Sequence, residues 1–381
     1  MIYLFLLALA LLLLLLYGGK RSNAKRPYYI YCGLLVAVAA ARFRVGGDSL
    51  AYQDTFSNLP NLQGLLTFHF REAEFNPLWY VFNAIIKSIH NDFTFFQLVH
   101  ALVVNIIVFR FIAHYALNKY WIMPFYLVLN YVYFNMEILR EVLAICTFLL
   151  SVGHLLKKDW KRYYLLCIVA YLFHTSAFIL FLFPLVNRRY KLWQQAVMVG
   201  VVFLMSTPVT ISFLEQNVFP LLGASAKAAS YLSVQVSETG FFYQLLKILP
   251  VFITFYIRKK TLRRQHVFSS LVFPYLLLGV LSSQYAGAYR FLNYLSIPML
   301  VYVIDTLYEL FIFRKYVPFY YVGVRAGVLL MVLLQLQYLT RDTSYYAADS
   351  RYYNRYYPYR NVLNPQVESK REALYYNFMN L

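Results

Sequence analysis

Residues 138–158 read ILREVLAICTFLLSVGHLLKK and carry the pattern that decides the fold. The stretch is mostly apolar from residue 138 to residue 156, and about 20 such residues in a helix span the hydrocarbon core of a bilayer. Polar side chains stand at both ends, Arg140 and Glu141 at the start and Lys157 and Lys158 at the finish. The stretch therefore predicts a transmembrane helix with a basic anchor at one end.

The same pattern recurs along the whole chain. Of its 381 residues, 61% are hydrophobic and only 13% are charged, against about 25% charged in a soluble domain. Apolar segments of roughly 15 to 25 residues occur at 2–17, 28–41, 76–91, 94–115, 120–136, 138–156, 163–187, 192–213, 241–257, 266–282, 291–312 and 317–337. We expect an all-α fold, a polytopic transmembrane helical bundle of about 10–12 apolar helices with one or two re-entrant or broken segments.

The first apolar segment, 2–17, is expected to be a retained span. Basic residues follow it instead of preceding it, and no Ala-x-Ala-like cleavage site is present, so it does not match a signal peptide. We expect one transmembrane domain over residues 1–337. Residues 338–381 are expected to form a Tyr-rich extracytoplasmic tail that packs on it.

Basic residues predict which loops are cytoplasmic. The net charge of +19 would indicate nucleic acid in a soluble protein, but here about half of the basic residues fall in short clusters between apolar segments. These clusters are Lys20 to Arg26, Lys157 to Arg162, Arg188 to Lys191, Arg258 to Arg264, and Arg314 with Lys315. The positive-inside rule places them in the cytoplasm. The loops 42–75, 214–240 and 283–290 and the tail then lie outside.

Two segments do not fit a simple count of crossings. Four apolar segments separate the outer loop 42–75 from the inner cluster at Lys157, yet the number of crossings must be odd. We therefore expect either 76–91 or 120–136 to be re-entrant or interfacial. Segment 163–187 has basic residues at both ends, which predicts two half-length helices that meet near His174. Irregular backbone at membrane depth is tolerated where it lines a cavity.

A compact polar group opens the outer loop and is the first candidate site. It comprises Arg42, Arg44, the pair Gly46-Gly47, Asp48 and Tyr52. Arginines clamp phosphate or carboxylate groups, glycines allow tight turns, and an aspartate can act as a general base. The alternative is a pair of interfacial arginines that close a helix with a capped turn.

A second candidate group lies near the outer end of the span 138–156. Glu137, Arg140 and Glu141 share one helix face, because residues three and four apart are neighbours. They form either a structural ion pair or an arginine presented to an anionic substrate and oriented by the glutamates. His174 is a candidate catalytic residue, although a lone histidine among aromatic residues is more often a buried structural group.

Other arginines and the tail complete the set of candidates. Arg110 and Arg290 are expected in the outer half of their spans, against the positive-inside bias, which indicates an anionic partner on that side; each is alternatively an interfacial anchor. In the tail, Tyr357, Tyr359 and Arg360 suit contact with sugar rings, or an interfacial aromatic belt. The three cysteines show no metal spacing, and no nucleotide-binding motif is present. We therefore expect no metal, no cofactor and no nucleic acid partner.

Four stretches of the chain resemble the EpsG family of exopolysaccharide-biosynthesis membrane proteins, which are similar to Wzy-type O-antigen polymerases. The resemblance runs from about residue 28 to residue 365. Its motifs are Arg42-Phe-Arg44-Val-Gly-Gly47-Asp48 with Tyr52 and Phe56, Ile138-Leu-Arg140-Glu-Val-Leu-Ala144, Ala170-Tyr-Leu-Phe-His174-Thr-Ser176-Ala177, and Tyr357-Pro358-Tyr359-Arg360. Glu141 stands where the family usually has glutamine.

The resemblance implies a membrane-embedded glycosyltransferase that polymerises undecaprenyl-diphosphate-linked oligosaccharide repeats on the outer face of the bacterial cytoplasmic membrane. On that basis Arg42, Arg44 and Arg140 hold the donor diphosphate, and Asp48 is the base for the acceptor hydroxyl. His174 supports the cavity floor, the tail tyrosines contact the glycan, and a chain-length regulator is a candidate partner. The competing hypotheses are a flippase or transporter of the same lipid-linked repeat, an O-antigen ligase, and a sugar acyltransferase.

Overall fold

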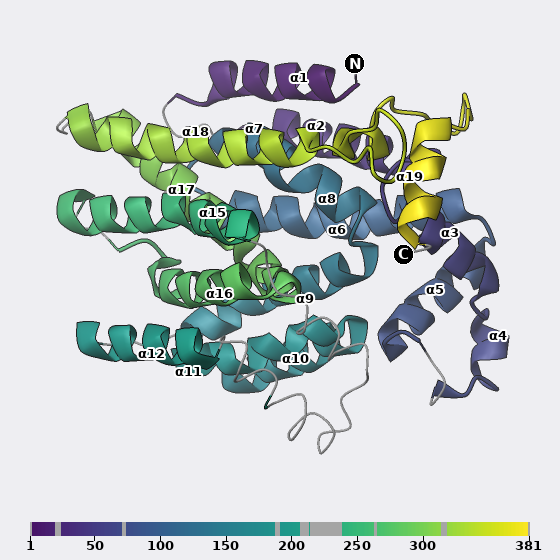
Figure 1. Ribbon diagram of the computed structural model, residues 1–381, viewed down its shortest axis with the longest axis horizontal. Coiled ribbons are helices and arrows are strands. Elements are labelled where there is room, and N and C mark those ends of the chain that lie inside the picture. The colour runs from purple at the N-terminus through teal and green to yellow at the C-terminus, as the bar shows by residue number, and fades with distance from the viewer. Residues whose placement is uncertain are drawn as a thin grey trace. The chain divides into compact units, whose positions relative to one another are not determined.

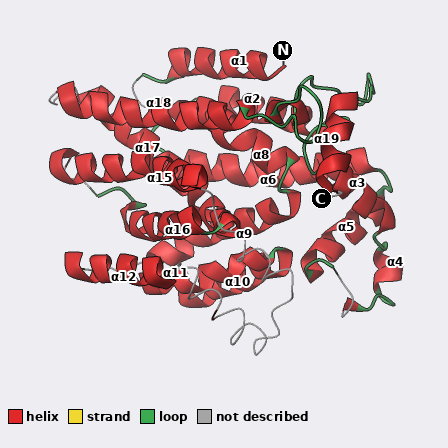
Figure 2. Ribbon diagram, viewed as in Figure 1, coloured by secondary structure: helices red, strands yellow, loops and turns green. Residues whose placement is uncertain are grey.

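Helices form nearly all of the regular structure in the computed structural model (Figures 1 and 2). The structure describes residues 2–19, 24–70, 74–186, 191–205, 213, 238–262, 265–313 and 318–379. Within these ranges the only β-type pairings are isolated bridges. Most of loop 214–240, the end of segment 192–213 and the basic residues Lys20, Arg21, Arg188, Arg189, Arg263, Arg264, Arg314 and Lys315 lie outside the described residues.

The chain divides into two compact units. Unit 1 comprises Met1–Phe178 and Gln335–Leu381, and unit 2 comprises Ile179–Leu334. The helices of unit 1 are α1 (Ile2–Tyr17), α2 (Arg26–Ala40), α3 (Ser49–Asn58), α4 (Leu62–Leu65), α5 (Pro77–Ile89), α6 (Phe93–Tyr115), α7 (Lys119–Tyr126), α8 (Val132–Met136), α9 (Leu139–Lys157), α10 (Trp160–Phe173) and α19 (Ser369–Met379).

Unit 2 contains the remaining α-helices of the described residues. They are α11 (Phe183–Val186), α12 (Leu192–Met205), α15 (Glu238–Ile257), α16 (Val272–Gln284), α17 (Tyr289–Phe313) and most of α18 (Pro318–Thr340), whose end belongs to unit 1. The division of the sequence into a transmembrane domain and a tail stays a prediction.

Among the described residues, five helices are long and apolar enough to cross a membrane. They are Phe93–Tyr115, Leu139–Lys157, Gly240–Lys260, Tyr289–Ile312 and Val322–Thr340, and shorter apolar helices include Ile2–Tyr17 and Arg26–Ala40. The expected all-α polytopic membrane bundle is confirmed, and the chain is a multi-pass membrane protein.

Helix α2 shows how an apolar segment becomes a membrane helix. Pro27 lies in its first turn, where the missing N–H costs nothing. Residues 28, 31, 32, 35, 36, 39 and 40 are buried, which is the spacing of one helical face. The opposite face exposes Ile30 and Leu34, by 65% and 37%. Such exposure of large apolar side chains is expected where lipid covers the helix.

One end of unit 1 gathers basic residues and is called the basic end below. Tyr28, beside Lys25 and Arg26 in sequence, donates to the carbonyl of Phe109 at 2.9 Å, which places the end of α6 beside the start of α2. The end of α9, with Lys157, lies here too, because Gly153 is close to the hydroxyl of Tyr115. Two of the basic clusters therefore share one end, as the positive-inside rule requires.

The opposite end of unit 1, called the corner end, holds the residues that follow α2. In the favoured orientation of its amide, Gln97 near the start of α6 donates to the carbonyls of Ala40 and Arg42. The start of α9 lies at the same end, since the ring of His100 meets the carbonyl of Leu139 at 2.8 Å. The polar groups that the sequence singled out on either side of α6 thus come together.

The segment 120–136 crosses between the two ends. At the basic end Tyr120 donates to the carbonyl of Ala24 at 2.8 Å, and at the corner end Tyr3 donates to the sulfur of Met136 at 3.5 Å. A π-helical stretch, Leu127–Tyr131, joins α7 to α8. Such π-helical turns occur mostly as short bulges within otherwise continuous helices.

The contacts of helix α5 place both of its ends at one end of unit 1, which indicates that it is the segment that does not cross. At its start Asn76 donates to the carbonyl of Tyr171 at 3.0 Å. At its end Lys87 donates to the carbonyls of Phe56 and Leu59, at 3.1 and 2.7 Å. Because residues 56–59 belong to α3 and its end, both ends of α5 stay near the corner end (Figure 1). Three crossings, by α6, α7–α8 and α9, then connect the loop to Lys157.

The break near His174 is confirmed. Helix α10 ends at Phe173, His174 has an extended backbone, and a 3-10 helix, Thr175–Leu182, follows. Helices α9 and α10 pack as an antiparallel hairpin, and α10 is about five residues shorter than α9. At about 1.5 Å per residue, His174 lies roughly one to two turns below the start of α9, toward the corner end instead of the middle of the hairpin.

Unit 2 contains a buried ionic cluster that the sequence did not suggest. Arg258 pairs with Glu309 at 2.6 Å and donates to the hydroxyl of Thr306 at 2.8 Å. Beside it, His266 meets Asp305 at 3.1 Å, and all these groups are 8% exposed or less. Because buried charges are costly unless they are paired, this cluster ties the end of α15 to α17.

Candidate functional site

The two glycines after Arg44 allow the loop to touch the start of α9. Gly46 has a φ of +119°, and a Cβ there would lie 2.2 Å from the carbonyl oxygen of Met136. A Cβ on Gly47 would lie 2.5 Å from Oε1 of Glu137. Only residues without a side chain fit so close to another backbone. The Gly-Gly pair thus brings the first and second polar groups of the sequence into contact.

Glu137 is the residue on which three segments converge. Its carboxylate accepts from the backbone N–H of Gly47 at 2.8 Å and from the hydroxyl of Tyr356 at 2.6 Å. Its Oε2 lies 3.5 Å from Nη1 of Arg355. Burial lowers the pKa of Arg355, but the charges of Glu137, Tyr352, Tyr356 and Asp48 together outweigh that effect, and the net pKa is raised. Glu137 is 4% exposed, so it positions the loop and the tail.

The tail continues this contact through its backbone. The N–H of Phe43 donates to the carbonyl of Arg360, and that of Gly46 to the carbonyl of Arg355, both at 2.9 Å. In the reverse sense the N–H of Val362 donates to the carbonyl of Ala41 at 2.9 Å. Residues 355–362 therefore run beside residues 41–46. The first and last motifs of the sequence form one structure, called the corner below.

Arg44 is fully engaged within the corner. Its Nε and Nη2 donate to the two carboxylate oxygens of Glu372 at 2.7 and 2.6 Å, a bidentate geometry. This hydrogen bonding raises the pKa of Arg44. Arg371 donates to the carbonyl of Arg44 at 3.0 Å and to that of Pro358 at 2.6 Å. Helix α19 is thereby fixed to the corner, and the charge of Arg44 is already neutralised.

Arg42 is buried beneath the corner, with 1% of its surface exposed. Its Nη1 donates to the carbonyl of Ala39, but its buried Nε and Nη2 have no hydrogen-bond partner in the described part of the chain. A buried guanidinium with open donors is costly. It therefore supplies positive potential under the site that an anion at the surface of the corner would feel.

Arg140 is the half-buried arginine of the corner. Its guanidinium lies over the ring of Phe75, 4.6 Å from the centroid, and within the described residues its buried Nε has no partner and no carboxylate forms an ion pair with it. Burial and the nearby charge of Asp48 raise the pKa of Tyr52, while Arg140 acts in the opposite sense. Asp48, Tyr52 and Arg140 are therefore electrostatic neighbours.

Asp48 precedes α3 and is exposed. Glu141, in the first turn of α9, is only 2% exposed. Tyr52 packs edge to face against Trp79 of α5, with ring centroids 5.5 Å apart. The non-crossing helix thus forms a wall of the site. The arrangement combines an accessible carboxylate with an arginine that is held in place by aromatic stacking.

His174 interacts with its near neighbour Ser176. Its Nδ1 lies 2.7 Å from the hydroxyl of Ser176 and accepts from that residue's N–H at 3.2 Å. This caps the broken end of α10. A path to the corner runs through α5, whose Asn76 meets Tyr171 and whose neighbour Phe75 meets Arg140. Both the supporting role that the family resemblance implies for His174 and a catalytic role for it stay predictions.

Arg110 requires a correction. It was expected in the outer half of its span, but the preceding residue, Phe109, meets Tyr28 at the basic end. Arg110 is exposed there, so it lies at the opposite end of unit 1 from Arg140. The error arose because the expected position of Arg110 assumed that the segment before α6 crosses the membrane. If α5 does not cross, α6 runs in the opposite direction and Arg110 lies at the other end.

Arg290 lies at the start of α17 in unit 2. Arg258, in the basic segment, meets Thr306 and Glu309 near the other end of that helix. Within unit 2, Arg290 is thus at the end away from the basic segment, as expected. Its role in substrate binding stays a prediction.

The tail residues that the sequence singled out have different positions. Tyr357 is 50% exposed. Tyr359 donates to the carbonyl of Val38 at 2.7 Å, and Arg360 pairs with Glu368. Tyr359 and Arg360 therefore anchor the tail, and only Tyr357 presents a free face to a ligand.

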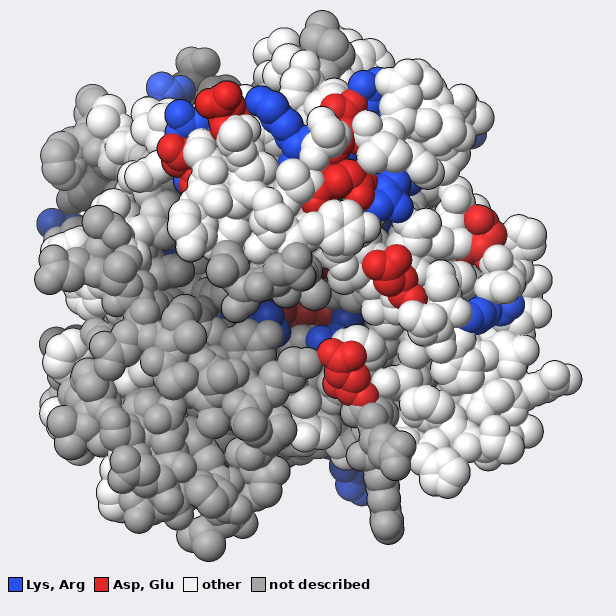
Figure 3. All heavy atoms as spheres, turned by 45° about the vertical axis from the view of Figure 1, so that its right-hand side comes forward, with Lys and Arg blue, Asp and Glu red and all other residues white. Residues whose placement is uncertain are grey.

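Several residues of the corner were missed by sequence reasoning. They are Phe75, Arg355, Tyr356, Arg371 and Glu372. Arg355 and Tyr356 belong to the Tyr- and Arg-rich run of the tail, which was the available signal. The end of unit 1 formed by α3, α5 and α19, which Figure 3 brings forward, shows acidic and basic side chains close together. This agrees with a polar site at one end of an apolar bundle.

Comparison with known protein families identifies a match over most of the chain. The model of the family described as "EpsG family" matches residues 25–361, which include the loop, the α8–α9 junction, His174 and the tail motif. No curated protein and no solved structure matches the chain significantly.

Proposed function

The chain belongs to the EpsG family of exopolysaccharide, Wzy-like polymerases, and we propose that it joins undecaprenyl-diphosphate-linked oligosaccharide repeats at its corner. The observation that carries the proposal is Arg140. It is half-buried, is oriented by Phe75, and is left without an ion pair in the described part of the chain while Arg44, Arg355 and Arg360 each have a carboxylate.

The location of the corner supports this reaction. The positive-inside rule assigns the basic end of unit 1 to the cytoplasm, so the corner faces the opposite side, in a bacterium the outer side of the cytoplasmic membrane. Flipped lipid-linked repeats present their diphosphate at that interface. An arginine at the head of a membrane helix is well placed to bind it.

The reaction needs a cation and a base. The bond between the anomeric carbon of the donor glycan and its diphosphate breaks, and the acceptor hydroxyl oxygen forms the new glycosidic bond. Arg140, supported by the potential of buried Arg42, neutralises the charge that develops on the departing diphosphate. Asp48 accepts the proton of the acceptor hydroxyl. Glu137 keeps the loop that carries Asp48 against α9.

The experiment compares Arg140→Ala and Asp48→Ala with Arg110→Ala, a matched arginine variant at the opposite end of unit 1. Each is expressed in cells that lack the native gene, and membrane levels are measured. Undecaprenyl-linked glycans are extracted and sized. We expect single repeats to accumulate on the outer side for Arg140→Ala and Asp48→Ala, and long chains for Arg110→Ala.

Two other outcomes would reject the proposal. Repeats trapped on the cytoplasmic side would show a flippase. Long chains of normal abundance in both corner variants would show that the reaction, if any, occurs elsewhere. A third variant, Arg140→Lys, retains the charge but loses the planar guanidinium, so we expect partial polymerisation.

A further inference from the structure

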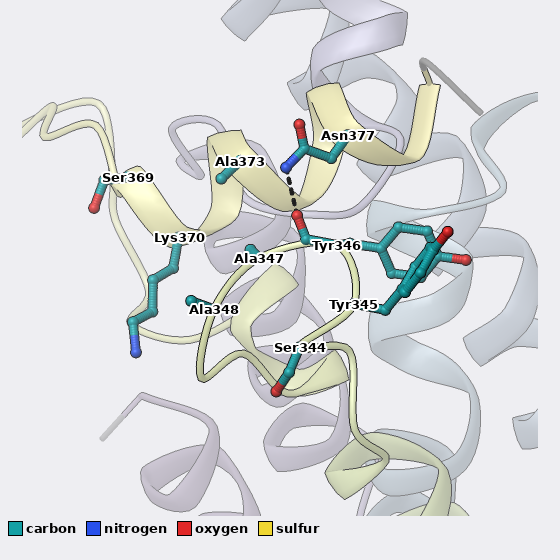
Figure 4. A pocket seen from close by; sticks show the side chains of 9 residues that line it. All are labelled: Ser344, Tyr345, Tyr346, Ala347, Ala348, Ser369, Lys370, Ala373 and Asn377. Atoms are coloured by element: carbon teal, nitrogen blue, oxygen red, sulfur yellow. Dashed lines mark hydrogen bonds between the residues drawn. The ribbon is translucent and has the colours of Figure 1, made fainter.

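A cleft in the tail lies outside the corner (Figure 4). It opens between the loop 344–348 and helix α19 and has a volume of about 410 Å³. Small-molecule sites occupy about 300–1,000 Å³, so the cleft is large enough for one or two sugar rings. In Figure 4 the alanines 347, 348 and 373 lie between the two tyrosine rings and the side chains of Ser369 and Lys370.

The lining of the cleft suits a carbohydrate. Tyr345 is 83% exposed, and its ring stands at 87° to that of Tyr346 with centroids 5.4 Å apart. Tyrosine offers a flat apolar face and a hydroxyl, which match the C–H face and the hydroxyls of a sugar. Lys370 is the single charged side chain of the lining, so the cleft favours a ligand rich in hydroxyls over a diphosphate.

The cleft is held in shape by contacts between its two walls. Asn377 of α19 donates to the carbonyl of Tyr346, and Lys370 donates to the carbonyl of Asp349 at 3.3 Å. These bonds fix the loop on the helix before any ligand arrives. Such preorganisation reduces the entropy that a ligand must overcome on binding.

Helix α19 is a wall shared by the cleft and the corner. Residues 369, 370, 373 and 377 line the cleft and share one helical face. On the other side, Glu372 binds Arg44, and the nearby charges of Asp54 and Asp48 add to burial in raising the pKa of Tyr375. A helix is about 10 Å across. A short glycan can therefore reach from Asp48 to the cleft.

We propose that this cleft is a carbohydrate subsite that holds the growing glycan a few sugars away from the reacting groups, an inference that rests on the proposed polymerase function. A second contact with the same chain raises its effective concentration at the corner. The polymer then dissociates less often between additions, and more repeats are added per encounter.

The binding test uses the full-length protein in lipid nanodiscs. The probe is the oligosaccharide repeat released by partial acid hydrolysis from the surface polysaccharide of the source cells, and affinity is measured by saturation-transfer NMR titration. Tyr345→Ala is expected to weaken binding by roughly two- to tenfold. The matched control is Tyr353→Ala, an exposed tail tyrosine outside the cleft, which should bind as the wild type does. Equal affinity of Tyr345→Ala and wild type overturns the inference.

A test in cells separates this inference from the proposed function. Tyr345→Ala should still polymerise but yield shorter chains, whereas Arg140→Ala should leave single repeats. If Arg140→Ala and Asp48→Ala polymerise normally while Tyr345→Ala weakens oligosaccharide binding, the carbohydrate site stands and the proposed active site is wrong. Normal chain lengths in Tyr345→Ala cells overturn the role of the cleft in elongation.

Discussion

At the scale of single residues, ion pairing distinguishes three arginines of the corner from Arg140, which has no carboxylate partner in the described part of the chain. Arg44, Arg355 and Arg360 each have a carboxylate within reach, and such pairs hold the loop, the tail and α19 together. Arg140 is stabilised by the face of Phe75 instead, which keeps its direction without neutralising its charge. Of these four arginines, we therefore expect Arg140 to contribute most to the binding free energy of an anionic ligand.

Glu137 supports a prediction at this scale. Glu137→Ala leaves Arg355 without its partner and removes the acceptor of Gly47 and Tyr356, and breaking a buried pair costs about 3–5 kcal/mol. We expect the tail to detach and limited trypsin digestion to cut after Arg355 and Arg360 much faster. The digestion rate in nanodiscs measures this.

The matched control for Glu137 is Glu368→Ala, since that carboxylate pairs with Arg360 at a more exposed position. Exposed pairs contribute about 0–1 kcal/mol, so its digestion rate should stay near that of the wild type. Equal rates for the two variants would show that Glu137 does not hold the tail.

At the scale of elements, the position of α5 bears on the direction in which α6, α7–α8 and α9 run within unit 1. Its ends contact Tyr171 and residues 56–59, so it lies within the corner end of unit 1. The 13 residues of α5 would extend only about 20 Å, less than the roughly 30 Å of a bilayer core. A non-crossing apolar helix beside a polar loop is a natural wall for a site at the membrane interface.

Cysteine labelling tests the position of α5. The native cysteines Cys32, Cys146 and Cys167 are buried. Labelling of a single exposed cysteine introduced by mutation can therefore be measured against a low background. Glu74→Cys and His90→Cys, near either end of α5, should both react with a membrane-impermeant maleimide added to intact cells. His114→Cys, at the basic end, should react only after permeabilisation. Labelling of His90→Cys only after permeabilisation would show that α5 crosses.

At the scale of the whole molecule, each unit contains one buried ionic network. In unit 1 it joins the loop, the α8–α9 junction and the tail at Glu137. In unit 2 it joins α15 and α17 through Arg258 and Glu309. Charges inside a membrane protein are rare and costly. The first network lies at the candidate site. We interpret the second network as a set of contacts that stabilises unit 2.

The second network can be tested by a double-mutant cycle. Glu309→Ala leaves Arg258 buried and unpaired, so we expect a loss of about 3–5 kcal/mol, seen as a lower thermal midpoint in detergent. Replacing both partners, as Arg258→Met with Glu309→Leu, should recover most of that loss. Arg351→Ala breaks an exposed pair with Asp342 and serves as the control. If Glu309→Ala left the thermal midpoint unchanged, the pair of Arg258 and Glu309 would not stabilise unit 2.

The sequence by itself determined the membrane bundle, the basic side of the spans, the break at His174 and the family. The first three depend on local signals, namely runs of apolar residues and clusters of charge, which can be read within a window of about 20 residues. The family depends on several short motifs and their order along the chain. The sequence also showed that one of two segments could not cross, but not which one.

Only the tertiary structure decided how those pieces meet. Tyr356 and Glu137 are 219 residues apart in the chain and 2.6 Å apart in space, and no local pattern pairs them. The same holds for Arg44 with Glu372, and for the position of Arg110 at the basic end. The physical reason is that the partner of a charge is set by packing and by the direction of each helix. A single non-crossing segment reverses that direction for the helices that follow it in unit 1.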